Sequence, residues 1–322
     1  MRDDGILMNT SAATARHAIS LIDLTDLSDD HAPDGINALC ARAAEHGTAA
    51  VCVWPEYVAR CVELLDGSDV GIATVVNFPK GNQQTGVVLD QTLTALSDGA
   101  TEIDVVLPYK MFRNGDVKPT ASLIEAVGDI IAPPGVLKVI LETGELDDEA
   151  IRGAAELAVG LGADFIKTST GKTDVSATLG AARIMLEVIA ATDRTVGLKP
   201  SGGIRTYDDA VAYLDLAAEM MGPEWATPST FRFGASGLLD ALLAEIVADR
   251  RSFKTAKPEI LDELGLPGKP DPAVFVEAAA RLGVGPSRAA VVEDAVSGVM
   301  AGRAGGFAIV VGLDRTRRPG EL

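Results

Sequence analysis

Four charged residues stand inside short apolar segments of the sequence, where charged side chains are uncommon. Asp104 lies in the segment EIDVV, Lys167 in FIKT and Lys199 in GLKP, while Asp23 ends the segment LID. Lysines and aspartates are rarely buried without a partner. Because burial and a neighbouring cation both disfavour the ammonium form, two adjacent buried lysines lower the pKa of one of them. The pattern therefore predicts a lysine amine that is uncharged near neutral pH.

A neutral lysine amine is a nucleophile that forms a Schiff base with a carbonyl compound. The protonated imine withdraws electrons, so the carbon–carbon bond beta to it breaks or forms more easily. We expect Asp104 to act as the general acid and base in these steps. A single buried lysine is more commonly a salt-bridge partner, but Lys167, Lys199 and Asp104 together favour catalysis.

Eight short apolar runs in the first 250 or so residues alternate with stretches of helical periodicity. The runs are Leu21–Asp23, Ala49–Val53, Gly71–Val76, Glu102–Val106, Leu137–Leu141, Phe165–Lys167, Val196–Lys199 and Phe231–Gly234. Continuous apolar strands are typical of a parallel sheet that is covered by helices. Eight such units predict an α/β protein with a (β/α)₈ TIM barrel. A dinucleotide-binding sheet is disfavoured, since no GxGxxG follows the first run.

The active site of such a barrel lies at the C-terminal ends of the strands. We expect Asp23, Asp104, Lys167 and Lys199 at four of these ends. Lys138 lies near the start of the fifth run. We therefore expect Lys138 toward the opposite face of the barrel, as an ordinary salt-bridge partner.

Polar, glycine-rich segments follow the last three runs, with TSTGK at 168–172, SGGIR at 201–205 and ASG at 235–237. Glycine lets the backbone approach an anion closely, and consecutive amides or a helix N-terminus bind phosphate. Barrels commonly build a phosphate site from the loops after strands seven and eight. These glycines would also serve tight turns, but Lys172 and Ser236 favour a phosphate site beside the lysine pair.

Charge and composition restrict the class of protein further. The net charge of −18, from 28 basic and 46 acidic residues, opposes a nucleic-acid partner. No apolar run approaches the roughly 20 residues that span a bilayer, and the N-terminus does not resemble a signal peptide. Cys40, Cys52 and Cys61 lack CxxC spacing and are expected to be reduced thiols. A cytoplasmic protein without a membrane partner is expected.

Six short motifs and Asp104 form an ordered pattern over residues 17–246. The motifs are DLT (23–25), NFP (77–79), LETGEL (141–146), FIKTSTGK (165–172), VGLKPSGGIR (196–205) and FGAS (233–236). The pattern resembles the deoxyribose-phosphate aldolase family of class I aldolases. This resemblance implies a TIM barrel that reversibly cleaves 2-deoxy-D-ribose 5-phosphate into acetaldehyde and D-glyceraldehyde 3-phosphate.

The resemblance also implies a role for each site residue. Lys167 would form the Schiff base, Lys199 would lower the pKa of that amine and transfer protons with Asp104, and Asp23 would join the relay. The substrate would be held by Thr168, Thr170, Gly171, Lys172, Gly202, Gly203 and Ser236. No cofactor or metal is implied. The partners would be a small phosphorylated sugar and aldehydes, and a homodimer is left open.

Two positions depart from the family pattern. Some members end in a tyrosine that is thought to assist proton transfer, whereas the last tyrosine here is Tyr213. The serine pair expected after the last strand is Ser236-Gly237, so one hydroxyl is absent from the phosphate site. Both departures bear on rate and phosphate affinity more than on the type of reaction.

The composition changes near residue 247, which predicts a barrel domain over 1–247, a linker over 248–262 and a partial α/β segment over 263–322. The motifs PGKPDP (267–272) and VVEDAVSGV (291–299) resemble the C-terminal part of a haloacid dehalogenase-like hydrolase. That chemistry needs a nucleophilic aspartate in a strand-end DxD motif, which this segment lacks. We expect a non-catalytic segment. The alternatives are a Mg²⁺-dependent phosphatase centred on Lys269 and Glu293-Asp294, or a barrel that binds a phosphosugar without catalysis.

Overall fold

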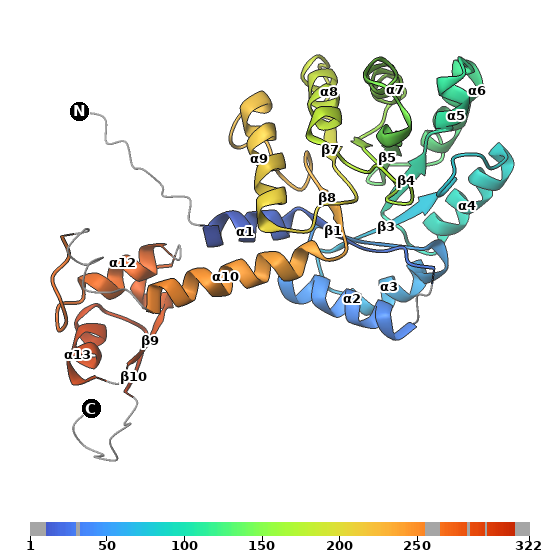
Figure 1. The fold of residues 1–322 in the computed structure, drawn as a ribbon. Coiled ribbons are helices and arrows are strands. Elements are labelled where there is room, and N and C mark those ends of the chain that lie inside the picture. Colours follow the sequence, from blue (N-terminus) through green and yellow to red (C-terminus); the bar gives the residue numbers. More distant parts are fainter. Residues whose placement is uncertain (1–10, 30–32, 255–264, 282–283, 294, 313–322) are drawn as a thin grey trace. The chain divides into compact units, whose positions relative to one another are not determined.

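The computed structural model describes residues 11–29, 33–254, 265–281, 284–293 and 295–312. These residues form two compact units (Figure 1). Residues 15–243 make up the larger unit, and the smaller one contains the described residues from 244 onward together with residues 11–14. In this part of the chain, no helix combines the length and apolar character needed to cross a membrane.

The larger unit is built around eight parallel strands, as the apolar runs predict. The strands are β1 (Ile22–Asp26), β2 (Ala50–Val53), β3 (Gly71–Val76), β4 (Glu102–Val106), β5 (Val136–Ile140), β6 (Phe165–Lys167), β7 (Gly197–Lys199) and β8 (Phe233–Ala235). Their order is β7-β6-β5-β4-β3-β2-β1-β8. Backbone hydrogen bonds between Leu198 and the residues before β8 close the ring, with Arg232 N donating to Leu198 O at 3.0 Å. The predicted TIM barrel is confirmed.

Helices follow the strands and cover the outside of the barrel (Figure 1). The helices up to residue 254 are α1 (Ser11–Ser20), α2 (Pro33–His46), α3 (Val58–Leu64), α4 (Thr85–Ser97), α5 (Tyr109–Arg113), α6 (Val117–Gly128), α7 (Asp148–Gly160), α8 (Leu179–Ala190), α9 (Tyr207–Met221) and α10 (Leu238–Lys254). Residues 11–14 of α1 and 244–254 of α10 belong to the smaller unit. Several begin at side-chain caps, such as Asp147 before α7 and Thr206 before α9. Because helices cover one face and the barrel interior the other, every residue of β2 is fully buried. The three cysteines are free and buried.

The C-terminal segment forms a small α/β arrangement with helices α12 (Ala273–Arg281) and α13 (Val296–Ala304). Its strands β9 (Ala290–Glu293) and β10 (Ile309–Gly312) pair in parallel. Residues 248–254 of the predicted linker are helical, because α10 continues to Lys254. Charged residues suit a helix as well as a linker, so composition alone did not separate the two. Residues 255–262 lie outside the described residues.

Candidate active site inside the barrel

Two lysine amines meet on one carboxylate oxygen inside the barrel. Lys167 and Lys199 are the last residues of β6 and β7 and lie opposite each other in the strand register. Lys167 Nζ donates to Asp104 Oδ2 at 2.7 Å, and Lys199 Nζ donates to the same oxygen at 2.8 Å. Lys167 is 2% exposed, and the other two side chains are fully buried. The sequence prediction that these three side chains come together is therefore correct.

A second carboxylate also holds Lys199. Asp23 Oδ2 lies 2.5 Å from Lys199 Nζ, and Asp23 Oδ1 accepts a hydrogen bond from Arg232 Nη1 at 2.5 Å. Arg232 Nη2 also donates to Glu102 Oε1 at 3.1 Å. Because successive side chains of a strand alternate between its faces, Glu102 and Asp104 both point into the barrel from β4.

Lys138 completes this cluster from β5. Its amine contacts Glu102, donates to Asp104 Oδ1 at 3.1 Å, and lies 3.7 Å from Asp23 Oδ2. The expectation that Lys138 lies away from the site was wrong. Lys138 and Asp104 are register partners of neighbouring strands, so both lie at the same level of the interior. Asp23 and Asp104 likewise lie within their strands rather than at the ends.

The ion pairs outweigh the cost of burial for most of these groups. Burial alone would raise the pKa of Asp104, but Lys138, Lys167 and Lys199 hold it well below the ordinary value. Asp23 has a lowered pKa for the same reason, through Lys199, Arg232 and Lys138.

Burial disfavours the charged form of Lys199, yet Asp104 and Asp23 raise its pKa above the ordinary lysine value. Lys138 also has a raised pKa, because Asp104 and Glu102 offset its burial. Lys199 and Lys138 are thus fixed cations beside Lys167.

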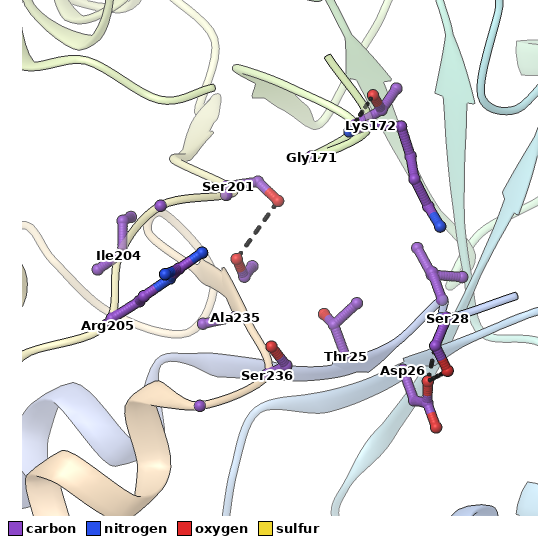
Figure 2. Close-up of a pocket in the computed structure, with 16 residues that line it drawn as sticks. Thr25, Asp26, Ser28, Gly171, Lys172, Ser201, Ile204, Arg205, Ala235 and Ser236 are labelled. Carbon is purple, nitrogen blue, oxygen red and sulfur yellow. Dashed lines mark hydrogen bonds between the residues drawn. The ribbon is translucent and has the colours of Figure 1, made fainter. Parts of the chain in front are cut away.

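A pocket of about 510 Å³ opens beside this cluster (Figure 2). Its lining comes from strands β1 and β8 and from the loops after β1, β6, β7 and β8, and includes Thr25, Asp26, Ser28, Thr170, Gly171, Lys172, Ser201, Gly202, Gly203, Arg205, Gly234, Ser236 and Gly237. Gly234 joins the pocket to the lysine pair, since a Cβ there would lie 3.2 Å from Lys199 Cε. Figure 2 shows Lys172 reaching toward the loop that carries Ser28, where its amine lies 3.2 Å from the Asp29 carboxylate.

The pocket presents backbone amides as well as side chains. Gly202 and Gly203 have φ values of 83° and 84°, a conformation that glycine adopts without strain. Within the described residues, the N–H groups of Gly171, Gly203 and Ser236 have no hydrogen-bond partner. Helix α10 begins directly after Ser236-Gly237, so the positive end of its dipole lies at the pocket. Free amides at a helix N-terminus suit an anion such as phosphate.

Most of the predicted binding residues line this pocket, but two differ from expectation. Thr168 is fully buried and does not line it, because its hydroxyl accepts a hydrogen bond from Ser201 N at 2.9 Å. Thr170 lines the pocket while its hydroxyl donates to Glu142. Glu142 is buried, and burial raises its pKa. Both threonines therefore shape the site through neighbouring residues.

Sequence reasoning missed Glu102, Arg232 and the true position of Lys138. A signal was present for Glu102, since it precedes Asp104 by two positions and so shares its face of the strand. Arg232 lies directly before β8 inside an apolar run, which is unusual for a charged residue. No local pattern showed that these side chains would meet, because Asp23 and Arg232 are 209 positions apart.

The barrel, the lysine pair on a shared carboxylate and the adjoining pocket place this chain among the TIM-barrel lyases. The chain belongs to the DeoC/LacD aldolase family, whose model matches residues 17–243. A deoxyribose-phosphate aldolase from Agrobacterium fabrum is 54% identical over 230 residues, which are 70% of this chain and 88% of that protein.

Solved structures agree with this family. A structure from Coccidioides immitis, assigned as a deoxyribose-phosphate aldolase, is 32% identical with a TM-score of 0.64, over 71% of this chain and 86% of that one. The aldolase QR15 is 27% identical with a TM-score of 0.63, over 73% of this chain and 97% of that one.

Residues 229–306, which include β8 and α10 as well as much of the C-terminal segment, match a second family model, that of the haloacid dehalogenase-like hydrolases. Lys269 pairs with Glu293 and lies 5.0 Å from the centre of the Phe275 ring. Asp294 lies outside the described residues. Among those that are described, no group of three or more histidine, cysteine or acidic residues is arranged to hold a metal ion.

Proposed function

We propose that this chain is a class I aldolase that reversibly cleaves 2-deoxy-D-ribose 5-phosphate into acetaldehyde and D-glyceraldehyde 3-phosphate. The observation that carries the proposal is the buried Lys167 amine, which shares one oxygen of Asp104 with Lys199 beside an anion pocket. The name of the Agrobacterium fabrum relative supports the same substrate.

Lys167 acts as the nucleophile in this mechanism. Its free amine attacks the C1 aldehyde of the open-chain sugar, and the carbinolamine loses water to form a protonated imine. The C3 hydroxyl then gives up its proton, and the C2–C3 bond breaks with its electrons moving toward the imine. D-glyceraldehyde 3-phosphate leaves, and an enamine remains. Protonation at C2 and hydrolysis release acetaldehyde and restore the amine.

Contacts within the site favour Lys167 over the other two lysines for this role. In the described cluster, Lys138 lies near three carboxylates and Lys199 near two, whereas Lys167 pairs with Asp104 alone. Lys167 is therefore held by the fewest ion pairs of the three lysines. Unlike Lys138 and Lys199, Lys167 directly precedes the 168–172 loop, and residues of this loop line the pocket.

Asp104 and Lys199 supply the proton transfers. The lowered pKa of Asp104 keeps this carboxylate ionised at neutral pH, so it begins the cycle as a proton acceptor. Lys199 is protonated and donates to the same oxygen. A proton that Asp104 accepts from substrate can therefore pass along the shared hydrogen bonds, while Asp23 keeps Lys199 in place.

The pocket holds the phosphate of the substrate in this proposal. Lys172 supplies a charge, while Gly171, Gly203 and Ser236 offer backbone amides. These donors compensate for the net charge of −18, which repels an anionic substrate at long range. We further propose that the enzyme works without a cofactor and in the cytoplasm, where phosphorylated sugars are metabolised. A homodimer stays a prediction.

Borohydride trapping tests this function directly. Reduction of the wild-type chain in the presence of 2-deoxy-D-ribose 5-phosphate should leave a stable mass adduct on Lys167. The variant Lys167→Ala should give none, while Lys118→Ala, which lacks an exposed lysine of α6, should give the wild-type adduct. Turnover of the sugar without an adduct would overturn the Schiff-base mechanism.

The two alternatives predict other outcomes in the same assay. A Mg²⁺-dependent phosphatase in the C-terminal segment would release phosphate in an EDTA-sensitive manner and would be indifferent to loss of Lys167. A barrel that only binds a phosphosugar would show binding without an adduct. We expect the segment to be non-catalytic, since it lacks the nucleophilic aspartate that this phosphatase chemistry requires.

A further inference from the structure

Arg232 and Glu102 lie next to the reacting groups without contacting the pocket. The Arg232 guanidinium contacts Asp23 through one nitrogen and Glu102 through the other, and it stacks 5.5 Å from the centre of the Phe165 ring. Arg232 is 7% exposed and Glu102 is 5% exposed. The proposed mechanism uses neither residue directly. Their burial in the barrel interior nevertheless places two full charges near the nucleophile.

The buried cluster does not balance its charges when every group is ionised. Four cations contact three carboxylates, which leaves one positive charge in excess. The cations are Lys138, Lys167, Lys199 and Arg232, and the carboxylates are Asp23, Glu102 and Asp104. Loss of one proton from the cluster would make it neutral. An excess charge in a poorly solvated interior thus favours release of a proton from one amine.

Most of the strands around Lys167 contribute a titratable or charged group. These are Asp23 on β1, Cys52 on β2, Glu102 and Asp104 on β4, Lys138 on β5, Glu142 after β5, Lys199 on β7 and Arg232 before β8. Cys52 stays a neutral thiol, because burial raises its pKa. Glu142 accepts hydrogen bonds from Thr170 and Thr173 and interacts electrostatically with Lys167 without forming an ion pair. The ion-paired cluster therefore makes the closest charged contacts to Lys167.

We propose that Arg232 and Glu102 are positioning residues that set the excess charge of the cluster and thereby the pH dependence of Schiff-base formation at Lys167. The link runs through contacts: Arg232 binds Asp23, Asp23 binds Lys199, and Lys199 shares Asp104 with Lys167. Glu102 acts from the opposite side through Lys138, which donates to Asp104. This inference rests on the proposed function of Lys167.

The two residues should act in opposite directions because their charges are opposite. Arg232→Gln removes the excess positive charge, so Schiff-base formation should begin at higher pH. Glu102→Gln increases the excess, so Schiff-base formation should begin at lower pH. At an effective dielectric constant of about 20, each substitution should move the pH profile by about one pH unit. A purely structural role would not produce shifts of opposite sign.

The experiment measures the rate of borohydride trapping of 2-deoxy-D-ribose 5-phosphate, and kcat/KM, from pH 5 to 9. The rising limb of both pH profiles should move to higher pH by about one unit in Arg232→Gln. It should move to lower pH by about one unit in Glu102→Gln. Arg232→Lys keeps the positive charge but loses the simultaneous contact of the guanidinium with Asp23 and Glu102. The rising limb of its pH profile should therefore lie close to that of the wild type, even if its maximal rate is low.

Arg194→Gln is the matched control. Arg194 donates to the carbonyls of Val159 and Gly162 at the other end of the barrel, so its loss should affect stability without moving the limb. Limbs that stay in place, or move in the same direction, in the two glutamine variants would overturn the inference. Absence of a Lys167 adduct in the wild type would instead overturn the proposed function, so the two failures are distinguishable.

Should a glutamine variant fail to fold, Asp23→Asn offers a second test. It removes a negative charge from the same cluster and should move the rising limb of the pH profile to lower pH, as Glu102→Gln does. Asp23→Asn also breaks the link to Lys199, so its maximal rate should fall as well. A shift of the rising limb to higher pH in this variant would contradict the proposed charge balance.

Discussion

The lysine–acid pair Lys167–Asp104 of the barrel and the pair Lys269–Glu293 of the C-terminal segment differ in their surroundings. Lys167 and Asp104 lie among further cations and carboxylates and are almost completely removed from solvent. The Lys269 side chain is 35% exposed, and its described acidic partner is Glu293 alone. Water screens such a pair and leaves it a modest structural contact. Burial and the neighbouring charges, rather than residue type, separate a reactive amine from an ordinary salt bridge.

Replacement of the barrel lysine should give the largest effect. Lys167→Ala removes the nucleophile, so kcat for cleavage of 2-deoxy-D-ribose 5-phosphate should fall by more than about 10⁴-fold. Steady-state kinetics of release of D-glyceraldehyde 3-phosphate measure this loss. A fall of less than tenfold would mean that Lys167 is not the nucleophile and that its pair with Asp104 is a structural contact, like the pair in the C-terminal segment.

Acid should destabilise the barrel through its buried carboxylates. The pKa values of Asp23 and Asp104 are lower in the folded chain than in the unfolded chain, so the unfolded chain binds protons more readily. Their stabilisation is complete above the ordinary carboxyl pKa of about 4 and is lost progressively as the pH falls from there toward the lowered pKa values of the folded chain.

Urea unfolding of the larger unit at pH 7 and pH 3 measures this change. Asp104→Asn should make the free energy of unfolding less dependent on pH in this range, although it lowers stability at pH 7 by leaving Lys167 without its carboxylate. An equal free energy of unfolding at the two pH values in the wild type would contradict the role assigned to the ion pairs.

A substitution in the pocket should affect binding more than chemistry. Ser236→Ala removes one hydroxyl from the pocket, so KM for the phosphorylated sugar should rise by about tenfold with little change in kcat. The comparison substrate is 2-deoxy-D-ribose without the phosphate, whose kinetics should not change. An equal effect on both sugars would place Ser236 outside the phosphate site.

The smallest effect is expected for the pair in the C-terminal segment. Lys269→Ala and Glu293→Gln should each change the aldolase rate by less than about twofold and the free energy of unfolding by less than about 1 kcal/mol, as for other solvent-accessible pairs. Aldolase assays and urea unfolding of the full chain measure both quantities. A loss of aldolase activity in either variant would show that the segment supports the barrel chemistry.

Local sequence determined much of the barrel. Apolar runs such as Gly71–Val76, Glu102–Val106 and Phe165–Lys167 coincide with strands β3, β4 and β6, because a strand buried on both faces must be apolar along its length. The position of Lys167 and Lys199 at strand ends also followed from sequence, since the polar loops begin directly after them.

Only the tertiary structure decided which charges share the interior and at what level. A strand shows from its alternation that Glu102 and Asp104 face the same way, but it does not show which residue of another strand lies opposite. Closure of the barrel and the stagger of its strands set this, and they bring Lys138 level with Asp104 and Arg232 against Asp23. The charge balance around Lys167 is therefore a property of the closed barrel, because it depends on contacts between residues far apart in the chain.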